Sequence, residues 1–512
     1  MSKPAKNIIR KQSLNLKYRG KVDGFALQRE FTEWYYQELF PELEAMVDQL
    51  APKHVHVRLD ILQVDVALTG AENWKEALRK QVLEDVGRQL RSTTQHAGGL
   101  SEERVRLKPD ENFFVLLQHY LQNGILPWWS DLSTKAEFDT ALEAWLFSDK
   151  IDGYVLGLSN ILESKTVVQR IATQFNERCF DRLMQLVAGD SMLVSRLELL
   201  KADTRALGVL VTRPEQADMM MSLKRVILVH LAGTNHNAQS IALAFSSVLM
   251  VNYARQLANL VRENMRSEEL ENAIFIIGPP GNIFQEHLIR LSATRKPEQA
   301  QKEDTASKGT EKDNDHTDIK TSEKTSEGKE SEKNADRKPN GRGTKDAEEG
   351  LYIQNAGLVI LAAFLPTLFR RLEWYEEADL VTPDQALYLL HYLATGKDEV
   401  PAEFELTFPK VLCGLPLEYV VKEPAQLNES QKQEADDLLV SAIEHWTILG
   451  KTSPDGLRSS FLQRNGKLVW KNDQWTVTVQ QAAYDMLLNH LPWNIALIRL
   501  PWMKHMLKTE WV

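Results

Sequence analysis

The chain has 512 residues, which is too many for one ordinary domain and suggests about three. Hydrophobic residues make up 43% of it and charged residues 26%, which leaves enough apolar surface for packed cores. The net charge of -10 argues against a dedicated nucleic-acid binder, because such proteins usually carry a basic excess.

Cysteine usage and hydropathy predict a soluble protein that is made in the cytoplasm. The two cysteines, Cys179 and Cys413, are far apart and belong to no CxxC pair, so we interpret both as buried structural thiols. Residues 1–10 lack the apolar core that follows the basic start of a secretory signal. The longest apolar stretch, 356–369, is shorter than the roughly 18 to 20 residues that cross a bilayer, so we expect no membrane span.

The beginning of the chain predicts a compact strand–helix–strand module. Apolar side chains alternate over 14–18, as in a half-buried strand. They then recur at helical spacing over 27–50, and Pro52 ends that helix. Alternation resumes over 55–61 and continues over 64–68 with its phase shifted by one residue, which indicates a bulge or two short strands.

A group of polar residues in this module raises the question of a metal site. His54 and His56 lie two residues apart on the predicted strand, so both face the same side, and Asp60 shares that face. Two imidazoles and a carboxylate could hold a metal ion. The same pattern also fits a solvated polar face, and no third His or Cys ligand is close in sequence. We favour the polar face and expect no metal and no cofactor.

The following region, 71–295, is mainly helical by its pattern. The exception is 273–281, an apolar run that ends in Gly-Pro-Pro-Gly and predicts a buried strand closed by a turn. This turn is not a phosphate loop, because it lacks the Lys-Ser/Thr pair and its two prolines have no backbone N–H.

Residues 296–349 consist almost entirely of charged and small polar residues, and Ile319 is the only large apolar one. The stretch holds 12 Lys and Arg against 15 Asp and Glu. Such a segment cannot bury enough apolar area to offset its chain entropy, which predicts a disordered linker. Its mixed charges fit a spacer better than a nucleic-acid tail.

After this linker the pattern predicts a helical domain with one β-hairpin. The hairpin strands are 462–470 and 475–479, joined by a polar turn. Cys413 follows Val411 and Leu412, and this apolar setting favours a core cysteine over a nucleophile. Helices are expected at 358–372, at 383–394, at 431–449 with Ser430 as N-cap, and at 481–491, where Pro492 ends the helix.

Two helix ends share a short motif. Residues 119–124 (HYLQNG) and 391–396 (HYLATG) match at four of six positions. Each closes an apolar helix with a glycine where a left-handed cap is expected. No fixed period repeats along the chain, so we infer no solenoid.

Prolines followed by tryptophan mark three corners of the chain. Each proline fixes the exit from a helix, and the adjacent Trp covers a large apolar area. One reading is a structural clamp, and the other is a docking surface, because Trp is a favoured interface anchor. The candidate protein-interaction residues are Trp128, Trp129, Trp493, Trp502, Met503 and Trp511. We see no catalytic signature in the sequence and therefore expect no catalytic residues.

The predicted fold class is α+β and predominantly α-helical. The expected divisions are a strand–helix–strand module at 1–70, a mainly helical region at 71–295, a disordered charged linker at 296–349, and a helical C-terminal domain with a β-hairpin and Pro-Trp corners at 350–512.

Several motifs occur in an order that resembles the contractile injection system tape measure proteins. The ordered set brackets nearly the whole chain outside the linker, and it is more specific than any single motif. It comprises Asn7–Gln12, Phe25–Leu50, Val55–Leu68, Gly124–Trp129, Asn355–Leu361, Tyr392–Gly396, Leu412–Pro416, Glu444–Trp446, Asp455–Arg458, Phe461–Arg464, Leu491–Trp493 and Leu500–Met503.

The resemblance implies a part in building a phage-tail-like particle, in which a contractile sheath surrounds a rigid tube on a baseplate. A tape measure protein occupies the tube during assembly, and its length sets the length of the tube. The implied partners are tube, terminator or baseplate proteins of the particle, with no nucleic acid. The chain is then cytoplasmic or incorporated in the assembled particle.

Three functions stay open on the sequence. The first is a structural assembly protein, acting as a ruler or as an adaptor at a tube end or baseplate. A continuous helix of this chain would span on the order of 770 Å at about 1.5 Å per residue, but its 19 prolines forbid one continuous helix. The second is an assembly chaperone that is absent from the finished particle. The third is an enzymatic effector, which lacks a supporting motif.

Overall fold

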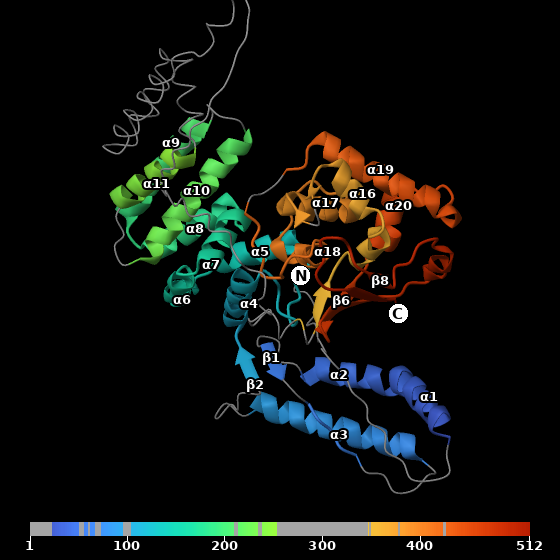
Figure 1. Cartoon of the computed structure of the whole chain (residues 1–512). Coiled ribbons are helices and arrows are strands. Elements are labelled where there is room, and N and C mark those ends of the chain that lie inside the picture. Colours follow the sequence, from blue (N-terminus) through green and yellow to red (C-terminus); the bar gives the residue numbers. More distant parts are fainter. Residues whose placement is uncertain are drawn as a thin grey trace, which may run out of the picture. The chain divides into compact units, whose positions relative to one another are not determined.

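The computed structural model of the chain has an α+β fold that is mainly helical, as predicted (Figure 1). The predicted linker at 296–349 lies outside the described residues, except for Ala347. The residues that the structure describes are 23–50, 56–59, 62–66, 73–95, 104–208, 213–233, 238–252, 347, 350–376, 379–422 and 426–511.

The chain divides into two compact units, which are described separately. The first unit combines residues 1–187 with residues 342–512, and the second comprises 188–341. The first unit is therefore built from two segments that lie far apart in the sequence. The four divisions expected from the sequence stay predictions.

A long helical run near the N-terminus confirms the helix predicted at 27–50. Its buried aromatic side chains pack against a further helix, where Phe31 stacks on Trp74 with 6.1 Å between ring centroids. The run consists of α1 (Gly24–Trp34), a π-helical turn η1 (Tyr35–Leu39) and α2 (Phe40–Leu50), and the further helix is α3 (Trp74–Gln95).

Two short strands form an antiparallel ribbon in the same unit. β1 (His56–Leu59) pairs with β2 (Arg104–Leu107), so the strand predicted at 55–61 is confirmed where it is described. The strand predicted at 64–68 is wrong as far as it is described, because residues 62–66 have no regular structure. The strand predicted at 14–18 lies outside the described residues.

Five helices complete the N-terminal segment of the first unit and confirm the helical pattern expected there. The apolar face of one of them buries Val167, Val168 and Ile171, which fixes its orientation. The helices are α4 (Pro109–Asn123), α5 (Lys135–Leu146), α6 (Val155–Ile161), α7 (Lys165–Gln174) and α8 (Glu177–Ala188), and a 3-10 turn η2 (Ile151–Tyr154) precedes α6.

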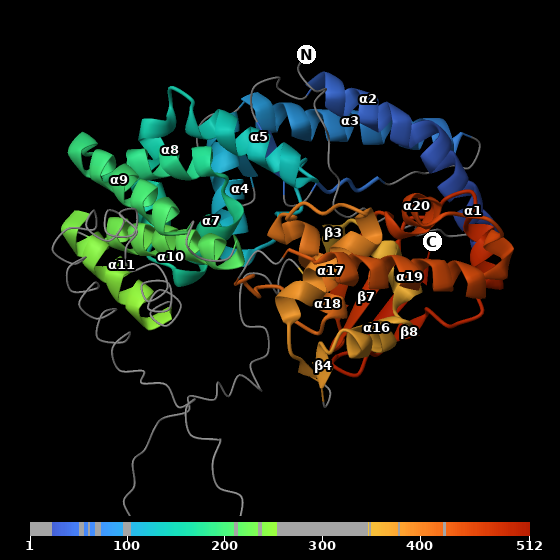
Figure 2. The same ribbon diagram turned by 90° about the horizontal axis from the view of Figure 1, so that it is seen from above.

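The second unit, as far as it is described, contains three helices that pack on one another (Figure 2). They are α9 (Ser191–Gly208), α10 (Arg213–Ala232) and α11 (Ala238–Asn252). Leu197, Ile227 and Phe245 are fully buried among them. The turn predicted at 273–281 lies outside the described residues. No helix in the described part of the chain has the length and apolarity to span a membrane.

The C-terminal segment of the first unit has a hydrophobic core that includes Leu361, Leu390 and Phe408. Its helices gather on one side of a β-sheet (Figures 1 and 2). They are η3 (Ala356–Leu361), α16 (Leu365–Arg371), α17 (Pro383–Thr395), η4 (Glu403–Leu406), α18 (Thr407–Leu412), α19 (Glu429–His445), η5 (Thr447–Leu449), α20 (Pro454–Leu457) and η6 (Arg458–Leu462).

The structure corrects three predicted helices of this segment. The helix predicted at 358–372 is a 3-10 helix followed by α16, since Pro366 lacks an N–H and takes a place in the first turn of a new helix. Asn428, not Ser430, caps α19, because Asn428 Oδ1 accepts a hydrogen bond from the Gln431 amide at 2.9 Å. The helix predicted at 481–491 is the 3-10 helix η7 (Asp485–His490).

Five strands form the sheet, in the order β3-β6-β7-β9-β8. The predicted hairpin is confirmed, except that its first strand begins at Gly466 and not at Leu462, which ends η6. Positive φ angles of 54° at Asn472 and 59° at Asp473 form its two-residue turn. β9 runs parallel to β7, a pairing that the sequence analysis did not predict. The strands are β3 (Leu351–Ile353), β6 (Gly466–Lys471), β7 (Gln474–Val479), β8 (Leu497–Ile498) and β9 (Leu507–Trp511); a separate ribbon pairs β4 (Tyr375–Glu376) with β5 (Asp379–Leu380).

Candidate functional site

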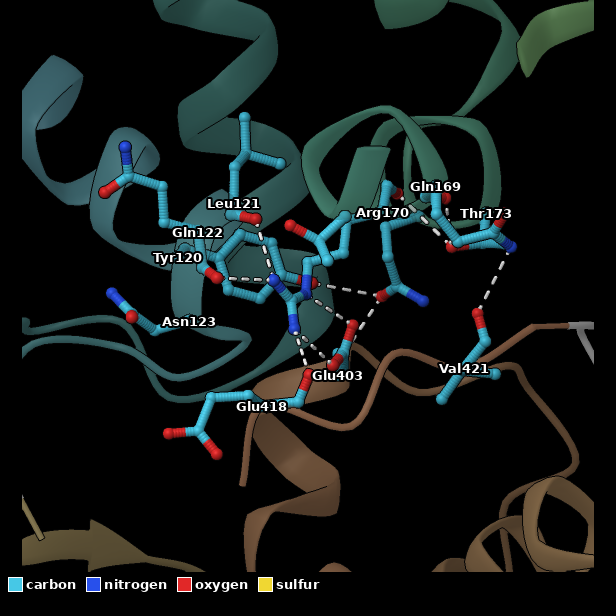
Figure 3. A network of polar contacts seen from close by, with 12 residues as sticks. Tyr120, Leu121, Gln122, Asn123, Gln169, Arg170, Thr173, Glu403, Glu418 and Val421 are labelled. Atoms are coloured by element: carbon cyan, nitrogen blue, oxygen red, sulfur yellow. Dashed lines mark hydrogen bonds and ion pairs between the residues drawn. The ribbon is translucent and has the colours of Figure 1, made fainter. Parts of the chain in front are cut away.

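The two segments of the first unit meet at a buried ion pair between Arg170 and Glu403 (Figure 3). Arg170 projects from α7, Glu403 begins η4, and both side chains have 0% exposure to solvent. Arg170 Nε donates to Glu403 Oε2 at 2.9 Å, and Arg170 Nη2 donates to Glu403 Oε1 at 3.2 Å. This two-pronged pairing fixes the relative geometry of the two elements as well as neutralising charge.

Backbone carbonyls bind the remaining N–H groups of Arg170. Nη1 donates to the carbonyls of Leu121 and Gln122, both at 2.8 Å. Nη2 also donates to the Glu418 carbonyl at 2.9 Å. Together with the two bonds to Glu403, these contacts use all five N–H donors of a guanidinium. The carbonyls of Leu121 and Gln122 end α4, where the helix dipole favours a cation.

A second buried cation, Lys410 of α18, shares the carboxylate. Its Nζ donates to Glu403 Oε1 at 2.7 Å and to the Leu417 carbonyl at 2.9 Å. Burial lowers the pKa of Lys410, and the attraction of Glu403 opposes that effect. Two cations therefore face one carboxylate, and the dipoles of the bonded carbonyls offset the excess positive charge.

Tyr120 and Gln174 extend this network on the N-terminal side. Gln174 Oε1 accepts hydrogen bonds from the Glu403 amide at 3.0 Å and from the Tyr120 hydroxyl at 3.2 Å. Burial raises the pKa of Tyr120 well above its ordinary value, so its hydroxyl keeps the proton that it donates. The Tyr120 ring also meets Phe404 edge-on, with 5.6 Å between centroids. Polar and aromatic contacts thus join the same elements.

Gly124 closes α4 directly beside the ion pair. Its φ of 73° is the left-handed conformation, and its amide caps the helix by donating to the Tyr120 carbonyl at 2.7 Å. A β-carbon at this position would lie 2.5 Å from Glu403 Oε1 and 2.9 Å from Arg170 Nη2. The glycine therefore provides both the backbone conformation and the space for the network.

The second copy of the helix-end motif has a related arrangement. It ends α17 at Gly396, again in the left-handed conformation with a φ of 68°. Arg458 Nε donates to the Leu393 carbonyl at 3.2 Å, at the motif position equivalent to 121. Arg458 also pairs with Asp436 of its own segment at 2.6 Å. The shared motif thus reflects a shared way of capping a helix end, while Arg170 connects two segments.

The six predicted interaction residues lie either in the loop after α4 or at the C-terminal core. Trp128 and Trp129 are half-buried in the loop after α4. The other four, of which Met503 and Trp502 are buried, pack in or against the C-terminal core. Three of them donate indole N–H bonds of 2.8 Å to Ile360 (from Trp493), Leu412 (from Trp502) and Asp485 (from Trp511). These bonds hold the corners of the chain on the core; a role for the six residues in binding partners stays a prediction.

Both cysteines are buried, as predicted. Burial raises the pKa of the Cys179 thiol to about 11 and that of the Cys413 thiol further still. His54 and Asp60 lie outside the described residues, as does the side chain of His56. Within the described ranges, no group of His, Cys, Asp and Glu side chains has an arrangement that could hold a metal ion.

A surface hollow of about 680 Å³ lies beside η7, with Met486, Leu488 and Trp511 among its lining residues. Its charged lining residue is Asp485, whose two oxygens accept hydrogen bonds from Arg464 Nη2 at 2.6 and 2.5 Å. The carboxylate is thus already bound to a cation. The lining gives this hollow no set of converging acids, bases and nucleophiles of the kind that catalysis needs.

Sequence reasoning did not single out Arg170, Glu403 or Lys410. A signal was present, because Arg170 interrupts an apolar helix face and Lys410 directly precedes Val411 and Leu412. Charged residues inside apolar stretches are rarely fully buried unless they are paired. The identity of the partner, however, depends on tertiary contacts between distant segments.

Comparison with known protein families gives a match. The family model described as contractile injection system tape measure protein matches residues 6–511. No curated protein and no solved structure matches the chain. The family match spans nearly the full length, so the resemblance expected from the ordered motifs is confirmed. The chain therefore belongs to the contractile injection system tape measure protein family.

Proposed function

We propose that this chain organises tube assembly as a folded adaptor rather than as a continuous rod. Membership of the family gives the chain a structural role in assembling a contractile injection system. The observation that carries the adaptor proposal is the Arg170–Glu403 pair, which joins the segment before residue 188 to the segment after residue 341. A chain folded back on itself in this way cannot extend as one helix while the pair is intact.

The partners that we propose are tube, terminator or baseplate proteins of the particle. Trp128 and Trp129 are half-buried in the loop after α4, outside the C-terminal core against which Trp493 and Trp511 pack, and they are the anchors that we propose. The proposal assigns no enzymatic step, because the buried charges of the network bind one another and backbone carbonyls. The chain is made in the cytoplasm and joins the growing particle there.

Localisation within purified particles tests the adaptor proposal. A peptide tag placed within 296–349 and detected by labelled antibody in electron microscopy should mark one end of the tube. Label spread evenly along the tube contradicts an adaptor. Mass spectrometry of the same particles separates the two assembly roles, because a chaperone is absent from intact particles.

Particle length separates the adaptor from a ruler. Deleting 296–349 should leave the tube length unchanged in electron micrographs, and duplicating the same stretch should also leave it unchanged. A tube that shortens with the deletion and lengthens with the duplication supports a ruler and contradicts the adaptor.

A further inference from the structure

The contacts between the two segments of the first unit extend well beyond the ion pair. Ile125 of the N-terminal segment is part of the hydrophobic core of the C-terminal segment. Tyr120 and Phe138 both contact the Phe404 ring, with 5.6 and 5.9 Å between centroids. An apolar centre with aromatic anchors and a few paired polar groups is the composition of a stable protein–protein interface.

Hydrogen bonds at the edge of this interface run in both directions. Gln169 Nε2 of the N-terminal segment donates to the Lys422 carbonyl at 2.8 Å. Gln354 Nε2 of the C-terminal segment donates to the Ser133 carbonyl at 2.8 Å. Each segment therefore provides donors that the other segment accepts, over an area wider than the ion pair.

The N-terminal segment on its own does not bind all the N–H donors of Arg170. Two of the five Arg170 donors remain within the N-terminal segment, while three go to Glu403 and Glu418 of the C-terminal one. Glu403 Oε2 in turn accepts its ion-pair bond from Arg170. Separating the segments would break these three bonds and expose the apolar side chains around them to water, and both losses disfavour the separated state.

We propose that two segments of the first unit, residues 104–187 and 350–511, bind each other tightly enough to stay together without the covalent connection through 188–349. The intervening stretch is then an insertion in the first unit, and it can be cut or changed in length while the two segments remain together. The proposal does not rest on the adaptor role, because it concerns how the chain holds itself together and not where it binds.

Cleavage of the full-length protein tests this proposal. A recognition site for a specific protease is placed within 296–349, and the purified chain is cut under native conditions. Size-exclusion chromatography with light scattering should then show both fragments in one peak with the same mass as the uncut protein. Fragments that elute separately overturn the proposal.

The dissociation rates of two matched variants of the cleaved protein show whether the charge network holds the segments together. Glu403→Gln leaves Arg170 and Lys410 without their carboxylate, so the fragments should dissociate at least about tenfold faster. Glu510→Gln removes an exposed ion pair with Lys508 and should leave dissociation unchanged. If both variants dissociate alike, the charge network does not hold the segments together.

A milder change covers the case in which Glu403→Gln does not fold. Gln169→Ala removes bonds at the edge of the interface and keeps the buried charges paired. It should raise the dissociation rate by a smaller factor, with the uncut protein unchanged in circular dichroism. A dissociation rate equal to that of the wild type contradicts the proposed extent of the interface.

Discussion

Gly124 and Gly396 end their helices in the same left-handed conformation, with φ angles of 73° and 68°, but only the former abuts the buried pair of Arg170 and Glu403. A β-carbon on Gly396 would lie 3.4 Å from Arg458, whereas one on Gly124 would overlap Glu403 Oε1 at 2.5 Å. Comparing substitutions at the two positions therefore distinguishes the effect of backbone strain, which both share, from the effect of disturbing the charge network, which only Gly124 contacts.

Substituting each glycine with alanine uses this difference. Both variants carry the strain of a left-handed alanine, about 1 kcal/mol. Gly124→Ala should lose roughly 1–3 kcal/mol more, because the Glu403 carboxylate must move. Urea unfolding followed by circular dichroism measures both losses. Equal losses at the two positions contradict the close packing of Gly124 on the network.

Removing the negative charge of Glu403 should lower the stability of the protein far more than removing an exposed carboxylate. Glu403→Gln leaves two cations in the interior, and breaking a buried ion pair in this way costs about 3–5 kcal/mol. Lys410 is the group that can relieve the excess charge by losing its proton, because burial already lowers its pKa. Glu510→Gln should cost under about 1 kcal/mol in the same unfolding experiment. Equal losses of unfolding free energy in the two variants contradict a stabilising role for the Glu403 carboxylate.

His391 should make the first unit sensitive to acid. Burial lowers the pKa of His391 to about 4, and Lys397 adds to the effect. In the described part of the chain, His391 Nδ1 has no hydrogen-bond partner. Because the unfolded histidine binds a proton near pH 6.5, the stability due to neutral His391 is complete above that pH and is lost as the pH falls to about 4.

The expected loss over this range is roughly 3 kcal/mol. Unfolding measured at several pH values should show it in the wild type and in a His445→Gln control, since His445 is exposed. His391→Gln should flatten the dependence between pH 6.5 and 4. An unchanged slope in that variant assigns the acid sensitivity to other groups.

The two cysteines provide probes of opening in both segments. Cys179 lies in α8 and Cys413 follows α18, both buried, and burial raises the pKa of each thiol. Reaction with a thiol reagent at pH 8 should therefore be slow in the folded protein and rapid in urea. Gly124→Ala should speed up the reaction of both thiols, because it loosens the interface between the segments. Fast labelling of either cysteine in the native wild type disagrees with its burial.

The tryptophans should separate into structural and binding positions. Trp502→Ala removes a bond to Leu412 and a stack on Phe369 at 5.1 Å, so it should cost about 3–5 kcal/mol of stability. Replacing Trp128 and Trp129 together should cost less and should lower the yield of assembled particles in electron micrographs. A stable double variant that assembles normal particles refutes a binding role for these two residues.

Local sequence patterns predicted the helices and the hairpin well. The apolar spacing over 27–50 and 383–394 follows the helical period, and the alternation in 475–479 follows the strand period. The errors lie at the ends of helices and strands, because single hydrogen bonds determine at which residue an element begins or ends. Asn428 and Ser430 are both good N-caps, and the bond of Asn428 to the Gln431 amide determines where α19 begins.

Contacts between distant residues could not be read from one sequence. The parallel pairing of β9 with β7 and the ion pair of Arg170 with Glu403 both depend on how the chain returns to itself. No local spacing rule connects Arg170 to Glu403, so the network was missed. The burial of Lys410 was missed for the same reason, because a lysine is normally placed at the surface unless its partner is known.

The long separation between Arg170 and Glu403 also has a consequence in time. The two residues are 233 positions apart, so at about 5–20 residues per second a ribosome adds the second roughly 10 to 50 s after the first. During that interval the nascent N-terminal half presents Ile125 and an unmatched guanidinium to the cell. The yield of native protein should accordingly depend on translation speed and on the holdase chaperones that are present.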